Sequence, residues 1–554
     1  MRTGPRARST RLAAVGAVLA LLAGVVAAEV PDTQAREAVQ GLIARGSLLQ
    51  LKYPDFAAYR SDLNAFYWPS GYAPQWLADD GASRAALAEL ADAPTHGLDP
   101  ADYDVEWLQG EFAAIAAGDR ASERGPRADV ALTLAFFRFT SDLHRGRVPP
   151  ESAGFRFKRT HTRLDLAALL RSGLAAGNLH DTVLAAEPSF PLYRRLEQAL
   201  GRYRALAEEP LPELPPLPRS VRKIEPGGRY PGAAAIAERL RRVGDLPEDA
   251  AISPDNRYDG ALVDAVRAFQ DRHGLKADGV LGRETLAALA LPFAARIRQL
   301  ELTLERLRWL PELPPGPMIA VNIPSFRLWA FANGREDSAA KLSMPVIVGG
   351  AVSAKKTPVF IGDMRYIEFS PYWNVPPKIQ RAEIVPRLRR DPDYWEREAF
   401  EAVPVRGKGG AVTTLDAALG GLASGELRVR QRPGEKNALG AVKFVLPNTM
   451  DIYLHGTPAQ KLFDRSRRDF SHGCIRVADP SALAAFVLGD QPEWTDARIA
   501  EAMDAGTMSI ARLTRPIPVV IFYTTAIVDA TGRVLFAADI YGYDAKLEKA
   551  LKAR

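Results

Sequence analysis

The sequence contains a single cysteine, Cys474, among 554 residues, and a disulfide within one chain needs two cysteines. It has no basic tract with interleaved aromatic residues, so we expect no nucleic-acid partner. The H-E-x-x-H pattern of helical zinc peptidases is also missing, and we expect neither a metal nor a cofactor. After residue 28 no apolar run reaches the roughly 18–20 residues that span a bilayer.

The N-terminus has the pattern of a secretory signal peptide, residues 1–28. Arginines precede an apolar run that ends in small residues, and these arginines are Arg2, Arg6, Arg8 and Arg11. They account for four of the six excess positive charges, which leaves the remaining chain near neutral. We expect cleavage after Ala28; an uncleaved run would act as a membrane anchor. In both cases the rest of the chain would work outside the cytoplasm, in the periplasm.

A lone cysteine in an exported protein has two interpretations. It is either a reactive thiol or a small buried hydrophobic residue, because exported folds usually pair their cysteines. Composition does not decide between them, whereas the residues around Cys474 do.

The chain is too long for one hydrophobic core, and two to four domains are expected. Residues 29–209 are rich in Ala, Leu and Arg and predict a helical domain. Within it, Val130–Leu143 places apolar residues at helical spacing and predicts one buried face. A Pro-rich segment, 210–225, predicts an extended linker. Residues 226–295 then carry three helical patterns and predict a small three-helix domain.

The C-terminal half changes from helical to strand-like patterns. Residues 296–316 predict a connecting helix, and 317–545 predict a mostly-β domain with an inserted lid at 377–437. The expected fold class is therefore multi-domain α+β. The predicted strands are short apolar or alternating runs at 319–331, 344–348, 366–369, 443–446, 450–454, 519–523 and 534–538.

The residues that indicate chemistry lie close together near Cys474. His455 precedes it by 19 residues, and Cys474 ends the run Ser471-His472-Gly473-Cys474. A thiol becomes a good nucleophile when a neighbouring imidazole takes its proton and stabilises the thiolate. Gly473 lets the backbone come close to a carbonyl, so the N–H groups of Gly473 and Cys474 are candidate oxyanion donors. Arg476 is suited to hold a substrate carboxylate.

This stretch resembles the active-site signature of L,D-transpeptidases, in which a histidine is followed at similar spacing by Ser/Thr-His-Gly-Cys. Further segments resemble the same family in the same order, and the chain is similar to its large, multi-domain, periplasmic branch with a YkuD-type catalytic domain. These segments are 308–311, 344–349, 357–360, 371–376 and 437–444.

The resemblance implies an enzyme that crosslinks cell-wall peptides. Cys474 would attack a tetrapeptide stem before its terminal D-Ala and form a thioester, and the amine of a second stem would then give a 3→3 crosslink. His455 would be the base, although the reverse assignment with His472 stays open. The implied catalytic residues are Cys474, His455, His472 and Gly473, and the implied substrate-binding residues are Arg476, Tyr453, Trp373 and Ser471.

The three-helix segment resembles a peptidoglycan-binding domain, and 29–209 resembles the helical scaffold domain of the same enzymes. Such a binding domain would hold the enzyme on its polymeric substrate. The partners implied are peptidoglycan stem peptides and glycan, with the protein as a monomer. The alternative is that 226–295 only spaces the other domains.

Three rival functions remain to be weighed. Ser353-Ala354-Lys355-Lys356 fits the S-x-x-K of penicillin-binding serine enzymes, but no Ser-Asp-Asn or Lys-Thr-Gly completes that set. The same thioester could instead pass to water, which would make an L,D-carboxypeptidase or endopeptidase. A wall-binding protein without activity is a third possibility, against which the intact Cys474 and His455 argue.

Overall fold

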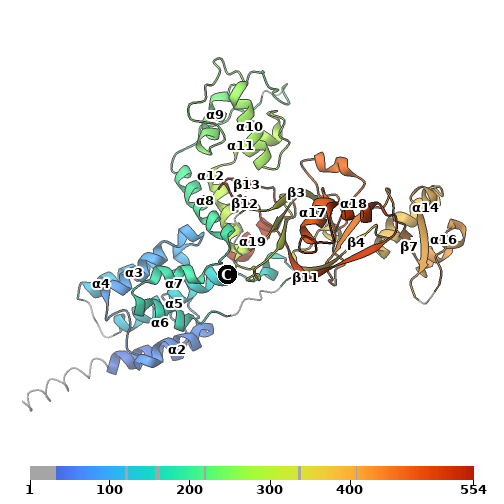
Figure 1. The fold of residues 1–554 in the computed structure, drawn as a ribbon. Coiled ribbons are helices and arrows are strands. Elements are labelled where there is room, and N and C mark those ends of the chain that lie inside the picture. Colours follow the sequence, from blue (N-terminus) through green and yellow to red (C-terminus); the bar gives the residue numbers. More distant parts are fainter. Residues whose placement is uncertain are drawn as a thin grey trace, which may run out of the picture. The chain divides into compact units, whose positions relative to one another are not determined.

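The computed structural model describes residues 33–118, 123–155, 157, 163–217, 220–334, 339–406 and 409–554. The predicted signal peptide, 1–28, lies outside these residues. The chain divides into two compact units, with residues up to 147 and 160–188 in unit 1 and residues 148–159 and 189–554 in unit 2. Figure 1 shows the helices of unit 1 in blue to cyan and the strands of unit 2 in yellow to red.

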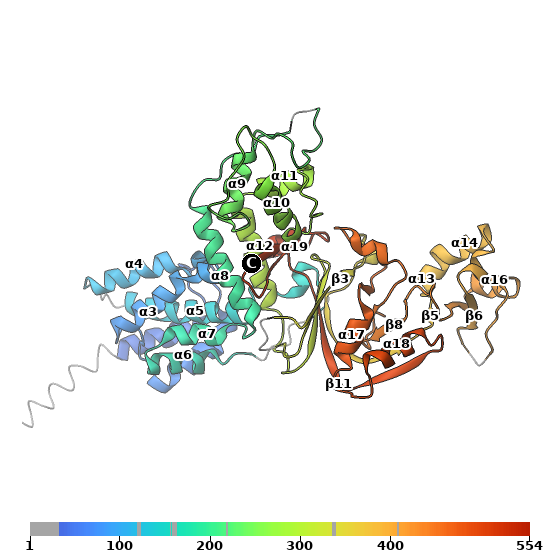
Figure 2. The same cartoon turned by 45° about the horizontal axis from the view of Figure 1, so that its top comes forward.

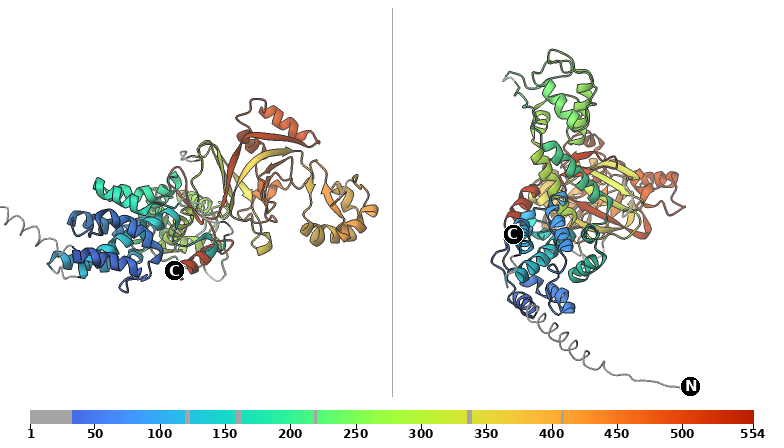
Figure 3. Two further views of the ribbon diagram at one scale, coloured as in Figure 1. Left: turned by 90° about the horizontal axis from the view of Figure 1, so that it is seen from below. Right: turned by 90° about the vertical axis from the view of Figure 1, so that its left-hand side faces the viewer.

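Unit 1 is entirely helical where it is described. Figures 2 and 3 show its helices lying side by side. Residues 33–45 are helical as well. The other helices are α2 (Arg60–Tyr67), α3 (Asp80–Ala91), α4 (Val105–Ala116), α5 (Arg124–Arg145), α6 (Leu166–Ala176) and α7 (Leu179–Ala186), with 3-10 turns at Ala57–Tyr59, Trp68–Ser70, Ala93–His96 and Pro100–Tyr103.

Helix α5 forms the centre of unit 1 and is buried on all sides. Every residue from Ala128 to Leu143 is buried, so the prediction of one buried face was wrong. The other helices of the unit surround α5, which its sequence period alone could not reveal. Its polar residues are paired instead of exposed. The Asp129 carboxylate accepts hydrogen bonds from the Tyr67 hydroxyl (2.6 Å) and from the N–H groups of Gln75 (3.0 Å), Trp76 (2.7 Å) and Leu77 (3.3 Å).

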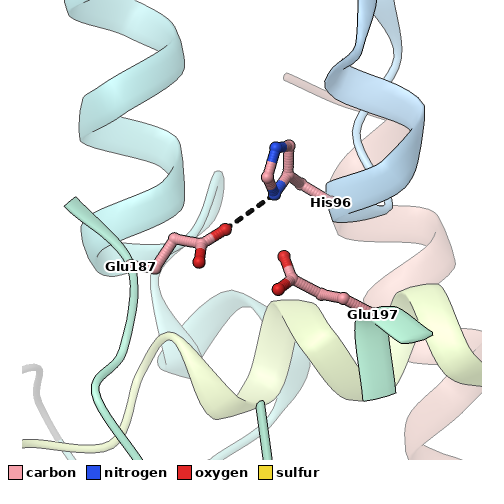
Figure 4. A group of neighbouring side chains, drawn as sticks. All are labelled: His96, Glu187 and Glu197. Carbon is pink, nitrogen blue, oxygen red and sulfur yellow. Dashed lines mark ion pairs between the residues drawn. The ribbon is translucent and has the colours of Figure 1, made fainter. Parts of the chain in front are cut away.

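A second buried polar pair in unit 1 joins His96 to Glu187. His96 Nδ1 lies 2.7 Å from a Glu187 carboxylate oxygen. Figure 4 marks this ion pair with a dashed line. Both side chains are almost completely buried. The pair connects the turn after α3 to the end of α7, and within unit 1 it has a structural role.

Two helices that pack together in unit 2 were predicted from the sequence to belong to different domains. Helix α8 (Pro191–Ala207) packs on α12 (Phe293–Leu307) and on a hairpin of β12 (Ala526–Val528) and β13 (Val534–Phe536). Their shared core contains Leu196, Leu200, Leu300 and Leu304. Although the sequence predicts 29–209 as one domain, the apolar face of α8 is buried in unit 2. The predicted strand at 534–538 lies in this hairpin and is not part of the barrel described below.

Three helices form at 226–295, namely α9 (Ala233–Arg242), α10 (Gly260–Arg272) and α11 (Arg283–Ala290). The described residues of the Pro-rich segment before them form neither helix nor strand, and several of them contact the three helices. The Tyr230 hydroxyl donates to the Pro215 carbonyl (2.6 Å), and the Arg239 guanidinium donates to that of Pro212 (2.6 Å). Leu214 and Leu217 pack against the three-helix core.

The C-terminal part of unit 2 contains a closed eight-stranded barrel in the order β1-β11-β4-β8-β9-β10-β3-β2. The pairs β1–β11 and β9–β10 are parallel, and the others are antiparallel. The predicted run 319–331 forms two strands, because a turn at 323–326 interrupts it. The strands are β1 (Met318–Asn322), β2 (Arg327–Phe331), β3 (Leu342–Ile347), β4 (Phe360–Phe369), β8 (Val442–Val445), β9 (Leu454–His455), β10 (Ile475–Val477) and β11 (Ser509–Phe522).

The segment between β4 and β8 folds as a small body, which we call the inserted subdomain (residues 373–437; Figures 1 and 2). A three-stranded sheet, in the order β5-β7-β6, and several short helices enclose a separate hydrophobic core. Its elements are β5 (Trp373–Asn374), α13 (Pro377–Ile379), the π-turn η7 (Gln380–Ile384), α14 (Val385–Arg390), α15 (Tyr394–Arg397), β6 (Phe400–Pro404), α16 (Leu415–Ser424) and β7 (Leu427–Gln431).

Helices α17 (Pro480–Val487), α18 (Asp496–Asp504) and α19 (Tyr543–Lys552) complete unit 2, with short turns at Pro150–Ala153, Ser353–Lys355 and Gln460–Asp464. The predicted fold class is confirmed, with a helical N-terminal part, a three-helix domain and a strand-rich C-terminal part. Among the described residues, no helix combines the length and apolar character needed to cross a membrane.

Candidate active site

Two short parallel strands bring the predicted site residues together. Cα atoms pair Ile475 with Leu454 and Arg476 with His455 across β9 and β10. Side chains alternate between the two faces of a sheet, and paired residues share a face. Leu454 and Ile475 point into the barrel core and are fully buried. His455 and Arg476 therefore point to the outer face, with Tyr453 and Cys474 two residues before them.

His455 is buried on this face, and its hydrogen bond defines its tautomer. Nδ1 lies 2.6 Å from the Gly456 carbonyl oxygen, which can only accept, so Nδ1 carries the proton. The lone pair is then on Nε2. Burial, together with the positive charge of Arg476, lowers the pKa of His455 to about 3. The resting imidazole is thus neutral, with one nitrogen able to accept a proton.

Cys474 is half-buried, and its sulfur faces groups that do not ionise it. Sγ lies 3.5 Å from the Asp451 carbonyl and is also hydrogen-bonded by Tyr453. Burial raises the pKa of the Cys474 thiol, and the Tyr453 contacts only partly oppose this. Burial thus disfavours the charged form of both groups at rest, and the transfer of the thiol proton to the imidazole stays a prediction.

The turn before Cys474 decides which backbone N–H groups are available. Gly473 has a φ of 126°, a conformation that L-residues with a side chain rarely adopt. Its N–H donates to Ser471 Oγ (3.1 Å), and Ser471 Oγ donates to the Cys474 carbonyl (2.5 Å). Of the two predicted oxyanion donors, the Gly473 N–H is thus already engaged. The N–H of Cys474 has no hydrogen-bond partner among the residues described.

Arg476 is a cation without an anion. Its side chain is half-buried, its Nε atom is buried, and the described part of the chain offers this group no hydrogen bond or ion pair. Burial lowers the pKa of Arg476 for the same reason. A surface ion pair, the structural alternative for this residue, is not what the structure contains. The guanidinium is instead available to a bound carboxylate.

His472 contacts the inserted subdomain. Its Nε2 lies 2.7 Å from the Glu383 carboxylate and 2.9 Å from Lys355 Nζ. Partial burial would raise the pKa of Glu383, but the hydrogen bonds and charges of His472 and Lys355 lower it. Sequence reasoning missed Lys355 and Glu383, since both are distant in the chain from the Cys474 motif.

A further charged pair lies beside Tyr453. The Tyr453 ring centroid is 5.7 Å from that of His455. Lys443 Nζ lies 4.8 Å from the Tyr453 ring centroid and 3.0 Å from the Glu368 carboxylate. Lys443 also pairs with His455 across β8 and β9. The sequence motif contained Lys443 without indicating that it lies at the site.

Two predicted groups are placed elsewhere or are not described. Trp373 lies in β5 and packs against the core of the inserted subdomain, which favours the structural alternative for this residue. The Ser353 side chain, on which the S-x-x-K alternative depends, lies outside the described residues. The lysine of that motif, Lys356, donates to the Tyr541 carbonyl (2.9 Å).

Two further histidines, His273 and His180, have partners within the protein. His273 is buried and stacks on Phe269 at 3.7 Å, and His180 lies 3.3 Å from Glu89. His161 is outside the described residues. We therefore treat these side chains as structural.

Three family models match separate parts of the chain. Residues 316–521 match the L,D-transpeptidase catalytic domain (YkuD), 229–289 the "Putative peptidoglycan binding domain", and 61–200 the Scaffold domain. These are the regions whose motifs resembled the same families, so the resemblance is confirmed.

One curated relative and two solved structures are similar to parts of the chain. A Haemophilus influenzae protein named "Putative L,D-transpeptidase" is 31% identical over 257 residues, which is 46% of this chain and 49% of that protein. The chain thus spans about half the length of this relative. An L,D-transpeptidase structure from Xylanimonas cellulosilytica is 17% identical, with a TM-score of 0.17, over 57% of this chain and 100% of that one. A fused Zn-dependent amidase/peptidase/peptidoglycan-binding protein from Clostridium acetobutylicum is 12% identical, with the same TM-score of 0.17, over 54% and 99%.

Proposed function

We propose that this protein is an exported enzyme that forms 3→3 crosslinks in peptidoglycan through a Cys474 thioester. The matches to a YkuD-type L,D-transpeptidase catalytic domain, a peptidoglycan-binding domain and a scaffold domain support this proposal. One observation carries this proposal. His455 in β9 pairs with Arg476 in β10, and Cys474 directly precedes β10, two residues before Arg476, so strand alternation favours one shared face for these three side chains.

The acylation half-reaction begins with a neutral thiol and a neutral imidazole. Since neither is charged at rest, His455 Nε2 takes the thiol proton as sulfur attacks, and not in a separate earlier step. Sulfur bonds to the carbonyl carbon of the third stem residue, whose oxygen becomes an oxyanion facing the Cys474 N–H. The C–N bond then breaks, and D-Ala leaves as an amine that receives the proton from His455.

The second half-reaction returns the enzyme to its starting state. The side-chain amine of a diaminopimelate residue in a second stem attacks the thioester, and His455 accepts its proton. The carbon–sulfur bond breaks, and the sulfur is protonated again. Arg476 holds a carboxylate of the donor stem by paired N–H···O bonds, which would fill its unmet hydrogen-bonding capacity.

The other parts of the chain support work on a polymer. The domain at 226–295 would keep the enzyme on glycan and raise the local concentration of stems. The inserted subdomain, whose Glu383 contacts His472, would act as the lid over the site. Export to the periplasm follows from the predicted signal peptide, and we propose that the protein works as a monomer.

The test compares the full-length protein with its Cys474→Ala variant on tetrapeptide-rich sacculi. We expect the native protein to yield 3→3 dimers and free D-Ala, and the variant to yield neither. Mass spectrometry of the native protein with a soluble tetrapeptide should show an adduct on Cys474 that lacks D-Ala. Trimmed monomers without dimers would identify a carboxypeptidase or endopeptidase instead, and dimers made by Cys474→Ala would refute the cysteine mechanism.

A further inference from the structure

A buried network on the inner side of the Cys474 turn involves residues that no motif in the sequence singled out together. Thr357 is completely buried, and Tyr541 and Ser471 nearly so. Tyr541 follows the region that matches the catalytic family, which ends at residue 521. It nevertheless reaches back to the segments that flank the nucleophile.

The hydrogen bonds of this network form a continuous chain. Thr357 Oγ1 donates to the Gly473 carbonyl (2.8 Å) and accepts from the Gly349 N–H (2.8 Å). The Tyr541 hydroxyl accepts from the Thr357 N–H (3.1 Å) and donates to the Gly349 carbonyl. The Tyr541 N–H in turn donates to the Tyr523 hydroxyl (2.9 Å). The Thr357 N–H and the Thr357 hydroxyl therefore each have defined partners.

The Gly473 carbonyl is therefore fixed in direction. A trans peptide group is planar, and its C=O and N–H point in opposite directions. The chain has no cis peptide bond among its described residues, so the Gly473–Cys474 peptide is trans. When Thr357 holds the Gly473 carbonyl toward the interior, the Cys474 N–H must point outward. That N–H is the one without a partner.

We propose that Thr357 and Tyr541 are positioning residues that aim the Cys474 N–H at the oxyanion of the reacting carbonyl. This inference rests on the proposed function. Neither side chain touches the substrate; both act by preventing rotation of one peptide plane. Gly473 supplies the permitted φ, and the Thr357–Tyr541 pair selects one orientation from those that glycine allows.

A pair of reagents separates this role from a general structural one. A carbapenem acylates a thiol through a tetrahedral intermediate, in which sulfur bonds to the lactam carbonyl carbon, its oxygen becomes an oxyanion and the lactam C–N bond then breaks. Iodoacetamide alkylates the same thiol by displacement of iodide and forms no oxyanion. Only the first reaction needs an aimed N–H.

Thr357→Val removes the hydroxyl with little change of shape, and Thr357→Ser retains it. For the full-length protein we expect Thr357→Val to lower the carbapenem acylation rate on the order of 100-fold, as loss of one oxyanion donor does, and Thr357→Ser to restore most of it. Tyr541→Phe, which removes a single oxygen, should lower it about tenfold. Iodoacetamide rates should stay within about threefold of the native rate. Tyr366→Phe is the matched control, since the described structure gives the Tyr366 hydroxyl no hydrogen bond.

The outcomes are distinguishable by mass spectrometry and thermal melting. Acylation of Thr357→Val and Tyr541→Phe at the native rate overturns the proposal. Equal losses in acylation and alkylation also overturn it, because the thiol itself would then have moved. If Thr357→Val does not fold, Tyr541→Phe decides. A native protein that iodoacetamide alkylates but no carbapenem or stem acylates contradicts the proposed function instead.

Discussion

Asp129 in unit 1 and Arg476 in unit 2 are both charged side chains withdrawn from water, yet the protein treats them in opposite ways. Asp129 accepts a hydrogen bond from one side chain and from three consecutive backbone N–H groups. Arg476 has no partner in the structure as described, and one of its nitrogens is fully buried. A buried charge whose hydrogen bonds are all made within the protein stabilises the fold. A buried charge without such partners can instead hydrogen-bond a ligand. The predictions below test this contrast.

The largest effect should come from the base at the unsatisfied site. The glutamine of His455→Gln can still hydrogen-bond the Gly456 carbonyl, but an amide cannot act as a general base at neutral pH. We expect crosslinking to fall about 1,000-fold or more, because general base catalysis contributes about 100- to 10,000-fold. Single-turnover release of D-Ala measures this directly. His180→Gln, at an exposed histidine, is the control, and equal losses in both variants would contradict the role of His455.

Removing each charge should have opposite consequences for folding and activity. Asp129→Ala leaves several buried donors unmatched and should destabilise unit 1 by about 3 kcal/mol. Arg476→Met removes an uncompensated buried charge, so unit 2 should be unchanged or about 1 kcal/mol more stable, while kcat/KM falls about 100-fold. Urea unfolding and steady-state kinetics measure the two quantities. If Arg476→Met lowers the free energy of unfolding as much as Asp129→Ala does, the proposed difference between these two side chains is wrong.

The same two regions should respond to acid with opposite signs. Burial lowers the pKa of His455 in the folded state to about 3, below its ordinary value of 6.5. As the pH falls from 6.5 toward 3, the unfolded state therefore binds this proton and the folded state does not. The free energy of unfolding falls over that range. Burial raises the pKa of Asp129 from 3.8 to about 6, so its contribution is fully present below 3.8 and is lost as pH rises through 6. Each effect amounts to roughly 1.4 kcal/mol per pH unit.

Hydrogen exchange resolved by peptide between pH 4 and 6 distinguishes the two units. Acidification should weaken protection near His455 and strengthen it around Asp129. His455→Gln and Asp129→Asn should each flatten the response of their own unit only. A parallel response of both units would show that these two groups do not control it.

The smallest effect concerns the contact between His472 and the inserted subdomain. Glu383 is exposed, and exposed ion pairs contribute about 1 kcal/mol or less. Glu383→Gln should therefore lower crosslinking only about three- to fivefold, with acylation by a soluble carbapenem nearly unchanged. Glu396→Gln, an exposed substitution on α15, serves as the comparison. A loss above about 100-fold would place Glu383 in the chemistry itself.

Cys474, His455 and Arg476 could be named from the sequence because they lie in one motif that resembles a family signature, and the structure brings their segments together in adjacent strands. Their roles stay predictions. Glu383, Lys355 and Tyr541 could not be named in this way, since they reach the Cys474 turn through the fold from distant segments. The protonation states of His455 and Cys474 could not be predicted for a related reason. They depend on burial, which the whole barrel determines, whereas residue type alone suggested an ionised thiol.

The fold shows the same division. Helices and strands appeared near their predicted places, since each has a clear period. The period could not say how many neighbours an element has, so α5 was expected to be buried on one face. It likewise could not tell that the strand at 534–538 pairs in a separate hairpin, or that α8 packs in unit 2.

The inserted subdomain has a sheet and a hydrophobic core of its own, with Trp395 and Leu422 at its interior. The inserted subdomain is consequently stabilised by its own hydrophobic core, which is separate from the core of the barrel. Evolution can therefore lengthen, shorten or recharge this segment without disturbing the barrel strands next to Cys474.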